Sequence, residues 1–503
     1  MKTLIENATI ITMNSKKEII NEGYILINDG LIAEVDSGHY AGNDDVIRID
    51  GKSSIIVPGL INAHTHSYAN LVKGTTENTP LELWMLYVMA DGKNMTDEDY
   101  CVSASLGSLE LLKSGTTTFL DHVGLDLPVF KKVAEHYKKI GIRVFLTPMF
   151  ADLPYGKSLS EPIQLEGVGA SSHGPSSKAN AGWKDLIDMV EDIVRLREPE
   201  KNIYVGVGPS GPHRVSDDLL VATMGLAEKY NLPWHTHLLE SKSQLAAAYR
   251  IYGKSMVAHL EHLGILNKRV SFAHGVWVDE EDIELIRKRE VSVVHNPYSN
   301  LYLGSGLAPI LLLKEAGVNV AIGTDGTNCT GSQSMFESMK LASVLSNQFT
   351  TDYTRWLKAY DILHMATIGG AKVIGMEEHL GSLEPGKFAD FILLDKNSTN
   401  FVPLNNLIWQ LVYGQADRAI KCVYVKGKKV VENGKVITVD ENSIYDEAII
   451  RGKRLLERTQ VDYEINKKEE YKIKRLHEGL SKSILKSPNN KVSFVKRPTI
   501  NKL

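Results

Sequence analysis

The feature that most constrains this chain is a repeated alternation of short apolar runs with longer helical patterns. Between residues 58 and 376, runs such as GTTTFLDH, IRVFLTPMF, VSFAHGV and VAIGTDG end in turn residues, and helical stretches such as DLPVFKKVAEHYKKIG lie between them. Alternating βα units are typical of a parallel sheet, and about eight strands over roughly 320 residues predict an α/β fold with a closed (β/α)8, TIM-like barrel. A doubly wound open sheet is the alternative, disfavoured because no glycine-rich nucleotide loop follows the first strand.

Both ends of the chain have a different sequence pattern from the middle. Residues 1–57 and 377–440 read as short strands separated by turns, for example at Asn28-Asp29-Gly30 and Asn433-Gly434. We expect these two regions to pair into one small β domain beside a barrel formed by residues 58–376. Residues 441–503 form a C-terminal, Lys-rich extension in which SIYDEAIIRGKRLLERTQ predicts an amphipathic helix. The rest of the extension is expected to be solvated and partly disordered rather than nucleic-acid-binding.

Composition narrows the class of ligand. The net charge of -4 over 503 residues is small, so nucleic acid is not an expected partner. The three cysteines are far apart, which fits a reducing cytoplasm better than a disulfide framework. The N-terminus lacks the apolar run of a signal peptide, and no stretch reaches the roughly 18 apolar residues that span a bilayer. We expect a cytoplasmic protein that binds a small molecule, with the Gly-, Ser- and Pro-rich segment 153–185 as a lid or a mobile surface loop.

Two apolar runs end in paired histidines. His64 and His66 close IIVPGLINAHTHS, and because residues i and i+2 of a strand face the same side, both imidazoles can reach one metal ion. His235 and His237 repeat the pattern in WHTHLLES, where Glu240 follows in the next loop. Spacing alone does not decide which of these two histidines is the ligand. A carboxylate that does not bind the metal is free to carry protons.

Two further strand ends carry metal-type residues. His274 ends SFAHGVW and Asp325 ends VAIGTDG. In a (β/α)8 barrel the carboxyl ends of all strands meet at one catalytic face, so residues far apart in sequence converge there. A packed core histidine and a helix-capping aspartate are the alternatives. Four independent strand ends with such residues favour a shared site.

Taken in order, these motifs resemble the amidohydrolase superfamily. The matching features are PGLINAHTH, HTHLLE, AHGVW, HNPYSNLYLGSGLAP, GTDG and GSLEPGKFADFILLD, and they look most like the branch of S-adenosylhomocysteine and methylthioadenosine deaminases and s-triazine (atrazine-type) hydrolases. The resemblance implies a composite β-sandwich from both termini and a homo-oligomer. It also implies one divalent ion, zinc or iron, held by His64, His66, His237 and Asp325.

The resemblance implies a hydrolytic deaminase of an aminated nitrogen heterocycle, such as a purine nucleoside derivative or a pterin. A metal-activated hydroxide attacks the amine-bearing ring carbon, Asp325 accepts the proton of the water, and His274 polarises water or substrate. Glu240 protonates the ring nitrogen and assists the departure of ammonia. Hydrolysis of an s-triazine or a cyclic amide is the alternative on the same fold. A catalytically dead barrel that serves as a binding protein is a further one.

Substrate contacts are expected from residues just beyond other strands. Trp84 in NTPLELW resembles the aromatic residue of a deaminase element, although an ordinary helix-face tryptophan fits equally well. His122, at the end of TTTFLDH, either lines the pocket or belongs to the core. His213 and Arg214 follow GPSGP and should face the pocket mouth. His295 and Asn300 in HNPYSN either reach the pocket or fix a turn through side-chain to backbone bonds.

Overall fold

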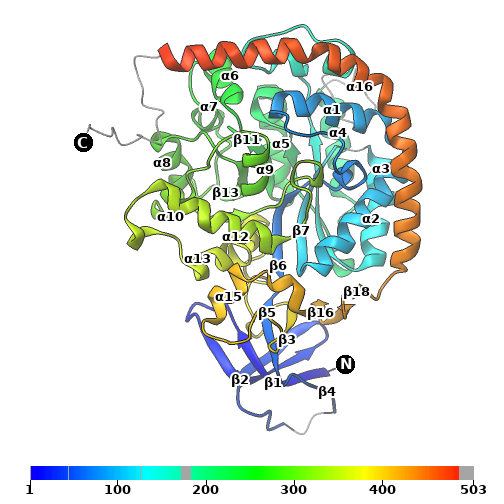
Figure 1. The fold of residues 1–503 in the computed structure, drawn as a ribbon, viewed down its shortest axis with the longest axis vertical. Coiled ribbons are helices and arrows are strands. Elements are labelled where there is room, and N and C mark those ends of the chain that lie inside the picture. Colours follow the sequence, from blue (N-terminus) through cyan, green and yellow to red (C-terminus); the bar gives the residue numbers. More distant parts are fainter. Residues whose placement is uncertain (1, 43–44, 125, 171–182, 487–503) are drawn as a thin grey trace.

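The computed structural model describes residues 2–42, 45–124, 126–170 and 183–486. Its centre is a ring of parallel strands in chain order (Figure 1). These strands are β6 (Leu60–Thr65), β7 (Thr116–Val123), β8 (Arg143–Phe150), β9 (Ile203–Val205) with β10 (Gly208–Pro209), β11 (Trp234–Leu238), β12 (Val270–His274), β13 (Ser292–His295) and β14 (Val320–Ile322).

Backbone hydrogen bonds join the two halves of this ring. One half runs from β6 to β10 and the other from β11 to β14. The His235 N–H donates to the Val207 carbonyl at 2.8 Å on one side, and the Asp325 N–H donates to the His64 carbonyl at 3.0 Å on the other. The expected (β/α)8, TIM-like barrel is therefore confirmed.

Helices surround the strands. They are α1 (Leu81–Asn94), α2 (Asp97–Lys113), α3 (Leu127–Ile140), α4 (Trp183–Val194), α5 (Asp217–Tyr230), α6 (Lys242–Tyr252), α7 (Met256–His262), α8 (Glu280–Lys288), α9 (Pro297–Tyr302), α10 (Ile310–Glu315), α11 (Thr327–Thr330), α12 (Met335–Ser346), α13 (Ala359–Met365), α14 (Ile368–Val373), α15 (Leu407–Tyr413) and α16 (Glu441–Lys486). In α3, Val129, Val133, Tyr137 and Ile140 recur at helical spacing and are buried. Gly141 ends this helix with a φ of +86°, a conformation that favours glycine.

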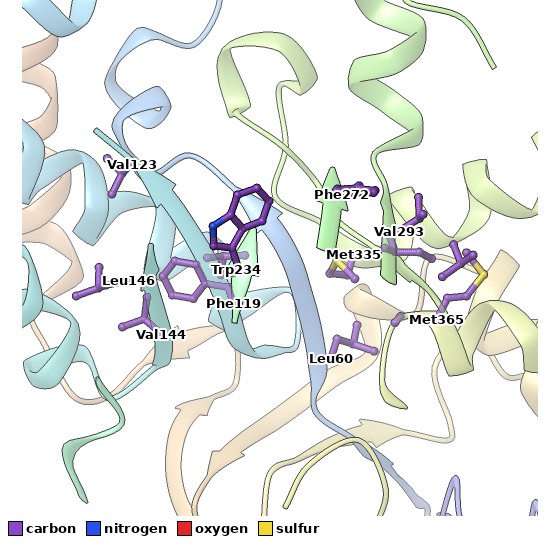
Figure 2. Close-up of a cluster of buried hydrophobic side chains, with 14 of the residues drawn as sticks. Leu60, Phe119, Val123, Val144, Leu146, Trp234, Phe272, Val293, Met335 and Met365 are labelled. Atoms are coloured by element: carbon purple, nitrogen blue, oxygen red, sulfur yellow. The ribbon is translucent and has the colours of Figure 1, made fainter. Parts of the chain in front are cut away.

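Strand alternation separates the core from the site. Phe119, Trp234 and Phe272 are almost fully buried and pack between strands and helices (Figure 2). Trp234 and His237 lie an odd number of residues apart on β11, so their side chains leave opposite faces of the strand. Apolar side chains thus stabilise the wall of the barrel, while the histidines point to its interior.

The two chain ends share one nine-stranded sheet, drawn at the bottom of Figure 1. Its strands are β1 (Lys2–Ile11), β2 (Ile19–Asn28), β3 (Leu31–Ser37), β4 (Val46–Asp50), β5 (Ser54–Pro58), β15 (Phe391–Asp395), β16 (Ile420–Val425), β17 (Lys428–Glu432) and β18 (Lys435–Val436). β15 runs antiparallel to β5 and aligns Phe391 with Pro58, which brings the N- and C-terminal segments together. A buried ion pair between Arg143 and Asp390 ties this β-rich region to the barrel.

The helix α16 is longer than the sequence predicted. It continues without a break through the Lys-rich residues KKEEYKIKRL, which were expected to be a solvated tail. Its buried positions recur every three or four residues, and they are Leu455, Thr459, Asp462, Asn466, Glu469, Ile473 and Leu476. Because the middle four are polar, hydrophobicity alone does not identify these positions as buried, although their spacing is that of a packed helix. Within the described part of the chain, no helix combines the length and apolar character needed to cross a bilayer.

Candidate metal centre and substrate cavity

Three strand ends bring four side chains to one point in the barrel mouth. His64 and His66 come from β6, His237 comes from β11, and Asp325 follows β14. The Nε2 atoms of His66 and His237 are 3.3 Å apart. Asp325 Oδ1 lies 3.7 Å from His64 Nε2 and 3.4 Å from His66 Nε2. We call these four residues the metal cluster.

Hydrogen bonds on the far side of each ring fix the histidines of the metal cluster. His66 Nδ1 lies 2.5 Å from the His122 carbonyl, and His237 Nδ1 lies 2.5 Å from the Ser210 carbonyl. A carbonyl oxygen only accepts, so each Nδ1 carries the proton and each Nε2 presents a lone pair. His64 Nδ1 lies 2.8 Å from His235 Nε2, which leaves His64 Nε2 facing the cluster.

This arrangement fits a divalent ion. His64 Nε2 is buried and has no hydrogen-bond partner among the described residues. Burial and the neighbouring imidazoles lower the pKa of both His64 and His237 well below the usual histidine range, which keeps them neutral. Bonds of about 2.1 Å to a tetrahedral ion place neighbouring ligand atoms about 3.4 Å apart, close to the distances between these side chains.

Two residues stand beside the metal cluster. Glu240 Oε2 lies 3.7 Å from His274 Nε2, and His274 Nε2 lies 3.8 Å from Asp325 Oδ2. Burial is the main cause that raises the pKa of Glu240 well above the usual range, and the negative charges of Asp325 and Glu82 add to it. Burial thus favours the protonated form of Glu240, which can donate a proton.

Backbone geometry aims His274 and Asp325. Regular strand alternation would place His274 on the same side as Phe272, which packs in the outer core. The backbone leaves the strand conformation at His274, where φ is +74°, and His274 faces the metal cluster. Asp325 has a similar φ of +65°. Such left-handed conformations are uncommon outside glycine and cluster at functional sites. Here they coincide with side chains that face the metal cluster.

A cavity opens above these residues. Its floor includes His66, His237, Glu240, His274 and Asp325. Its sides include Glu82 and Trp84 from α1, Tyr155 and Leu159 from the segment after β8, and His213 and Arg214 from the turn after β10. An apolar cavity with a few convergent polar groups is the usual form of a small-molecule site.

A model of the amidohydrolase family matches residues 55–430 of this sequence, which include every residue of the metal cluster. The chain belongs to the amidohydrolase family. The resemblance noted in the sequence is thus confirmed, and this amidohydrolase is a metal-dependent hydrolase that acts on carbon–nitrogen bonds.

Individual relatives agree with this assignment. The 5-methylthioadenosine/S-adenosylhomocysteine deaminase of Bacillus cereus is 33% identical over 465 residues, covering 91% of this chain and 100% of the relative. The 5'-deoxyadenosine deaminase of Methanothermobacter thermautotrophicus is 31% identical over 429 residues, covering 85% and 93%.

Solved structures share the fold. An adenosine deaminase of Xanthomonas campestris with bound zinc has a TM-score of 0.79 and 26% identity, covering 91% of this chain and 98% of that chain. The atrazine chlorohydrolase of Arthrobacter aurescens, complexed with zinc, has a TM-score of 0.80 and 25% identity, covering 89% and 99%.

Three of the expected substrate contacts lie on the cavity wall of this amidohydrolase, namely Trp84, His213 and Arg214. The other three do not. His122 is buried beneath the metal cluster with Nε2 3.0 Å from the Gly208 carbonyl, and burial lowers its pKa to about 3. Asn300 supports His274, since its Oδ1 lies 2.8 Å from His274 Nδ1. His295, at the end of β13, is buried and does not line the cavity.

The sequence did not predict most of the cavity wall, including Glu82 and Tyr155. Glu82 was read only as part of the NTPLELW motif around Trp84, and Tyr155 fell within the presumed lid. The structure places both on the cavity wall, where the Tyr155 hydroxyl donates to the Glu82 carbonyl at 3.1 Å. A single acidic residue within the apolar run LELWML, two positions before Trp84, was the available signal for Glu82. Residues 171–182 of the expected lid lie outside the described part of the chain.

Proposed function

We propose that this amidohydrolase is a deaminase that hydrolyses the exocyclic amine of a purine nucleoside derivative. One observation carries the proposal: Glu240, a neutral buried acid, faces a cavity whose floor is the metal cluster. An amine leaves poorly unless it is protonated, so deamination needs such an acid beside the reacting carbon. The printed activities of the two enzymes from Bacillus cereus and Methanothermobacter thermautotrophicus support this choice of reaction.

In the proposed reaction, water adds across the C=N bond at the amine-bearing ring carbon. A divalent ion held by His64, His66, His237 and Asp325 supplies the Lewis acidity that lowers the pKa of that water from about 15.7 towards 7. Asp325 accepts the proton of the water. His274, oriented by Asn300, hydrogen-bonds the attacking oxygen.

Glu240 serves the other side of the same carbon. It donates its proton to the ring nitrogen as the new C–O bond forms. The Glu240 carboxylate then takes the proton of the newly added hydroxyl group and passes it to the exocyclic nitrogen, so the C–N bond breaks, ammonia leaves and the ring carbon becomes a carbonyl. The proton held by Asp325 returns to Glu240 and restores the starting state. Glu240 lies 3.7 Å from His274, so one substrate atom can be reached from both.

Arg214 is placed to bind a group of the substrate away from the reacting ring. This guanidinium is 5% exposed, stacks 5.2 Å from the centroid of the Tyr155 ring, and has Nε and Nη2 without hydrogen-bond partners among the described residues. A buried charge without a counter-charge is costly, and the fork of donors matches a carboxylate or phosphate. We infer that the substrate carries an anionic group, which Arg214 binds.

The metal count, assembly and location complete the proposal. We propose one ion per chain, zinc in preference to iron, because three imidazoles and one carboxylate suit zinc. We further propose a homo-oligomer in the cytoplasm. Metal analysis together with the mass of the native assembly in solution tests the first two statements.

A panel of substrates tests the reaction. Purified, zinc-loaded protein is expected to release ammonia from an adenosine derivative, with loss of the exocyclic amine. The triazine alternative predicts chloride release from a chlorinated triazine, as the name of the Arthrobacter aurescens enzyme suggests. If the panel yields chloride or a ring-opened cyclic amide and no ammonia, deamination is the wrong reaction.

A further inference from the structure

The C-terminal helix packs against residues that line the substrate cavity, away from the metal cluster. The helix α16 begins beside α2, runs along one side of the barrel and then crosses its upper end, next to α1 (Figure 1). All of α16 lies beyond residue 430, where the match to the family model ends. Any role of α16 in the site is therefore a property of this chain rather than of the matched family domain.

Polar contacts fasten α16 to α1 in antiparallel order. Asp462 contacts Lys93 at 2.8 Å, and further along α16 the Asn466 amide donates to the Leu86 carbonyl at 2.8 Å. Glu470 then accepts from the Tyr87 hydroxyl at 2.8 Å. Along α16 the partners on α1 thus shift from Lys93 to Leu86 and Tyr87, which lie nearer to Glu82 in the first turn of α1.

Apolar packing joins the end of α16 to the cavity wall. Ile473 and Leu476 are 1% and 5% exposed, and they belong to a cluster with Leu86 and Met89 of α1 and with Tyr155 and Leu159. Tyr155 and Leu159 also line the substrate cavity. We call α1, residues 155–168 and the last turns of α16 the outer wall.

The last described contact of this series reaches Glu82. His477 Nε2 lies 2.9 Å from Glu82 Oε2, while the Ser241 hydroxyl donates to Oε1 of the same carboxylate at 2.5 Å. Glu82 is 3% exposed and lines the substrate cavity, whereas His477 lines only a neighbouring outer hollow. His477 thus contacts the carboxylate from behind, away from the substrate.

We propose that the end of α16 completes the substrate site of this enzyme, and that His477 is a positioning residue that holds the Glu82 carboxylate towards the hydrogen-bond donors of the substrate. The inference rests on the proposed function, because it assigns Glu82 a part in binding that function's substrate. A buried carboxylate that loses its partner is strongly disfavoured, so the side chain would turn towards solvent. The contact with Glu82 also raises the pKa of His477, which favours its cationic form.

Four variants of the full chain form the test. His477→Ala and Glu82→Gln are made singly and together, and His477→Arg restores a cation that can reach the carboxylate. Arg475→Ala is the matched control, because this exposed residue removes a positive charge from the same turn of α16 without a contact to the cavity wall. Kinetics are measured with the adenosine derivative that releases ammonia fastest.

The expected pattern separates positioning from catalysis. His477→Ala raises KM about tenfold and changes kcat less than about threefold, because it removes one charged contact from a binding residue. The double variant is no worse than Glu82→Gln, His477→Arg recovers most of the lost affinity, and Arg475→Ala behaves as the native enzyme. An unchanged KM in His477→Ala, or additive effects in the double variant, overturns the proposal.

A second measurement does not depend on turnover. Amide hydrogen exchange of the His477→Ala chain is expected to rise at residues 81–84 relative to the native protein and to Arg475→Ala. Unchanged exchange there overturns the positioning role whatever the reaction is. If the native enzyme releases no ammonia from any substrate, the proposed function fails, and the exchange data still decide whether His477 holds this turn of α1.

Discussion

The metal cluster and the outer wall are built on different principles. Each histidine of the metal cluster lies on a barrel strand or directly after it, is buried or nearly so, and is fixed by a carbonyl or an imidazole behind it. The outer wall consists of helical and irregular segments that are fastened by ion pairs and a small apolar cluster, and α16 lies beyond the matched family domain. The comparison teaches that the chemistry comes from the strands, whereas the shape of the binding site comes from what is added around them.

The largest effect is expected from the metal cluster. His237→Ala removes one of the four proposed ligands, so the chain should lose its bound ion and at least about 1000-fold in kcat/KM. Metal content and ammonia release measure both losses in one preparation. The control is His262→Ala on the exposed end of α7. A His237→Ala protein that keeps both metal and activity would remove His237 from the cluster.

Replacement of Glu240 should separate metal binding from proton transfer. Glu240→Gln preserves size but has no acidic proton, so kcat should fall about 100- to 10,000-fold while the metal content stays unchanged. Because the acid must be protonated, kcat of the native enzyme should fall as pH rises through the raised pKa of Glu240. The Gln variant should lack this limb. Glu284→Gln on the surface of α8 is the control.

An intermediate effect is expected from Arg214, which lines the substrate cavity between the metal cluster and the outer wall. Arg214→Met should raise KM about 10- to 100-fold for a nucleoside that carries a carboxylate or phosphate, because a bidentate charged contact is lost. A neutral nucleoside should be affected little. Arg214→Lys keeps the charge but loses the fork, and an intermediate KM is expected. Equal losses for charged and neutral substrates would mean that Arg214 only supports Tyr155.

The same division explains what the sequence could predict. His64, His66 and His237 were accessible because strand periodicity fixes which side chains share a face, and the barrel fixes where strand ends meet. Glu82 and α16 were not, because their roles depend on contacts between segments almost 400 residues apart. The buried stripe of α16 includes polar residues such as Asp462 and Asn466, so hydrophobic periodicity did not predict that this helix packs against the barrel.

His122 shows what strand position leaves open. Its place at the end of a strand motif allowed a pocket residue or a core histidine, and the structure shows the buried core histidine. There its Nε2 pairs with the backbone carbonyl of Gly208. Sequence periodicity identifies the face of a strand and leaves the depth along the barrel axis undetermined.

The smallest expected effect is a pH-dependent change in stability at the contact between α1 and α16. Asp91 is 1% exposed, accepts from the Tyr463 hydroxyl at 2.7 Å, and has its pKa raised by burial from 3.8 to about 7. A folded-state pKa above the unfolded value means that the folded protein binds this proton more tightly. The stabilisation is therefore complete below pH 3.8 and is lost as pH rises through about 7.

Asp91→Asn removes this titration while it keeps an acceptor for Tyr463. The native Tm should fall relative to that of the variant by about 2 °C or more between pH 5 and pH 8, measured by calorimetry at both values. Exposed Asp218→Asn on α5 should show no such difference. If the Tm of Asp91→Asn and that of the native protein change equally with pH, Asp91 does not bind a proton in this pH range. The outer wall would then be held together without a contribution from a protonated Asp91, and its stability would not depend on pH through this residue.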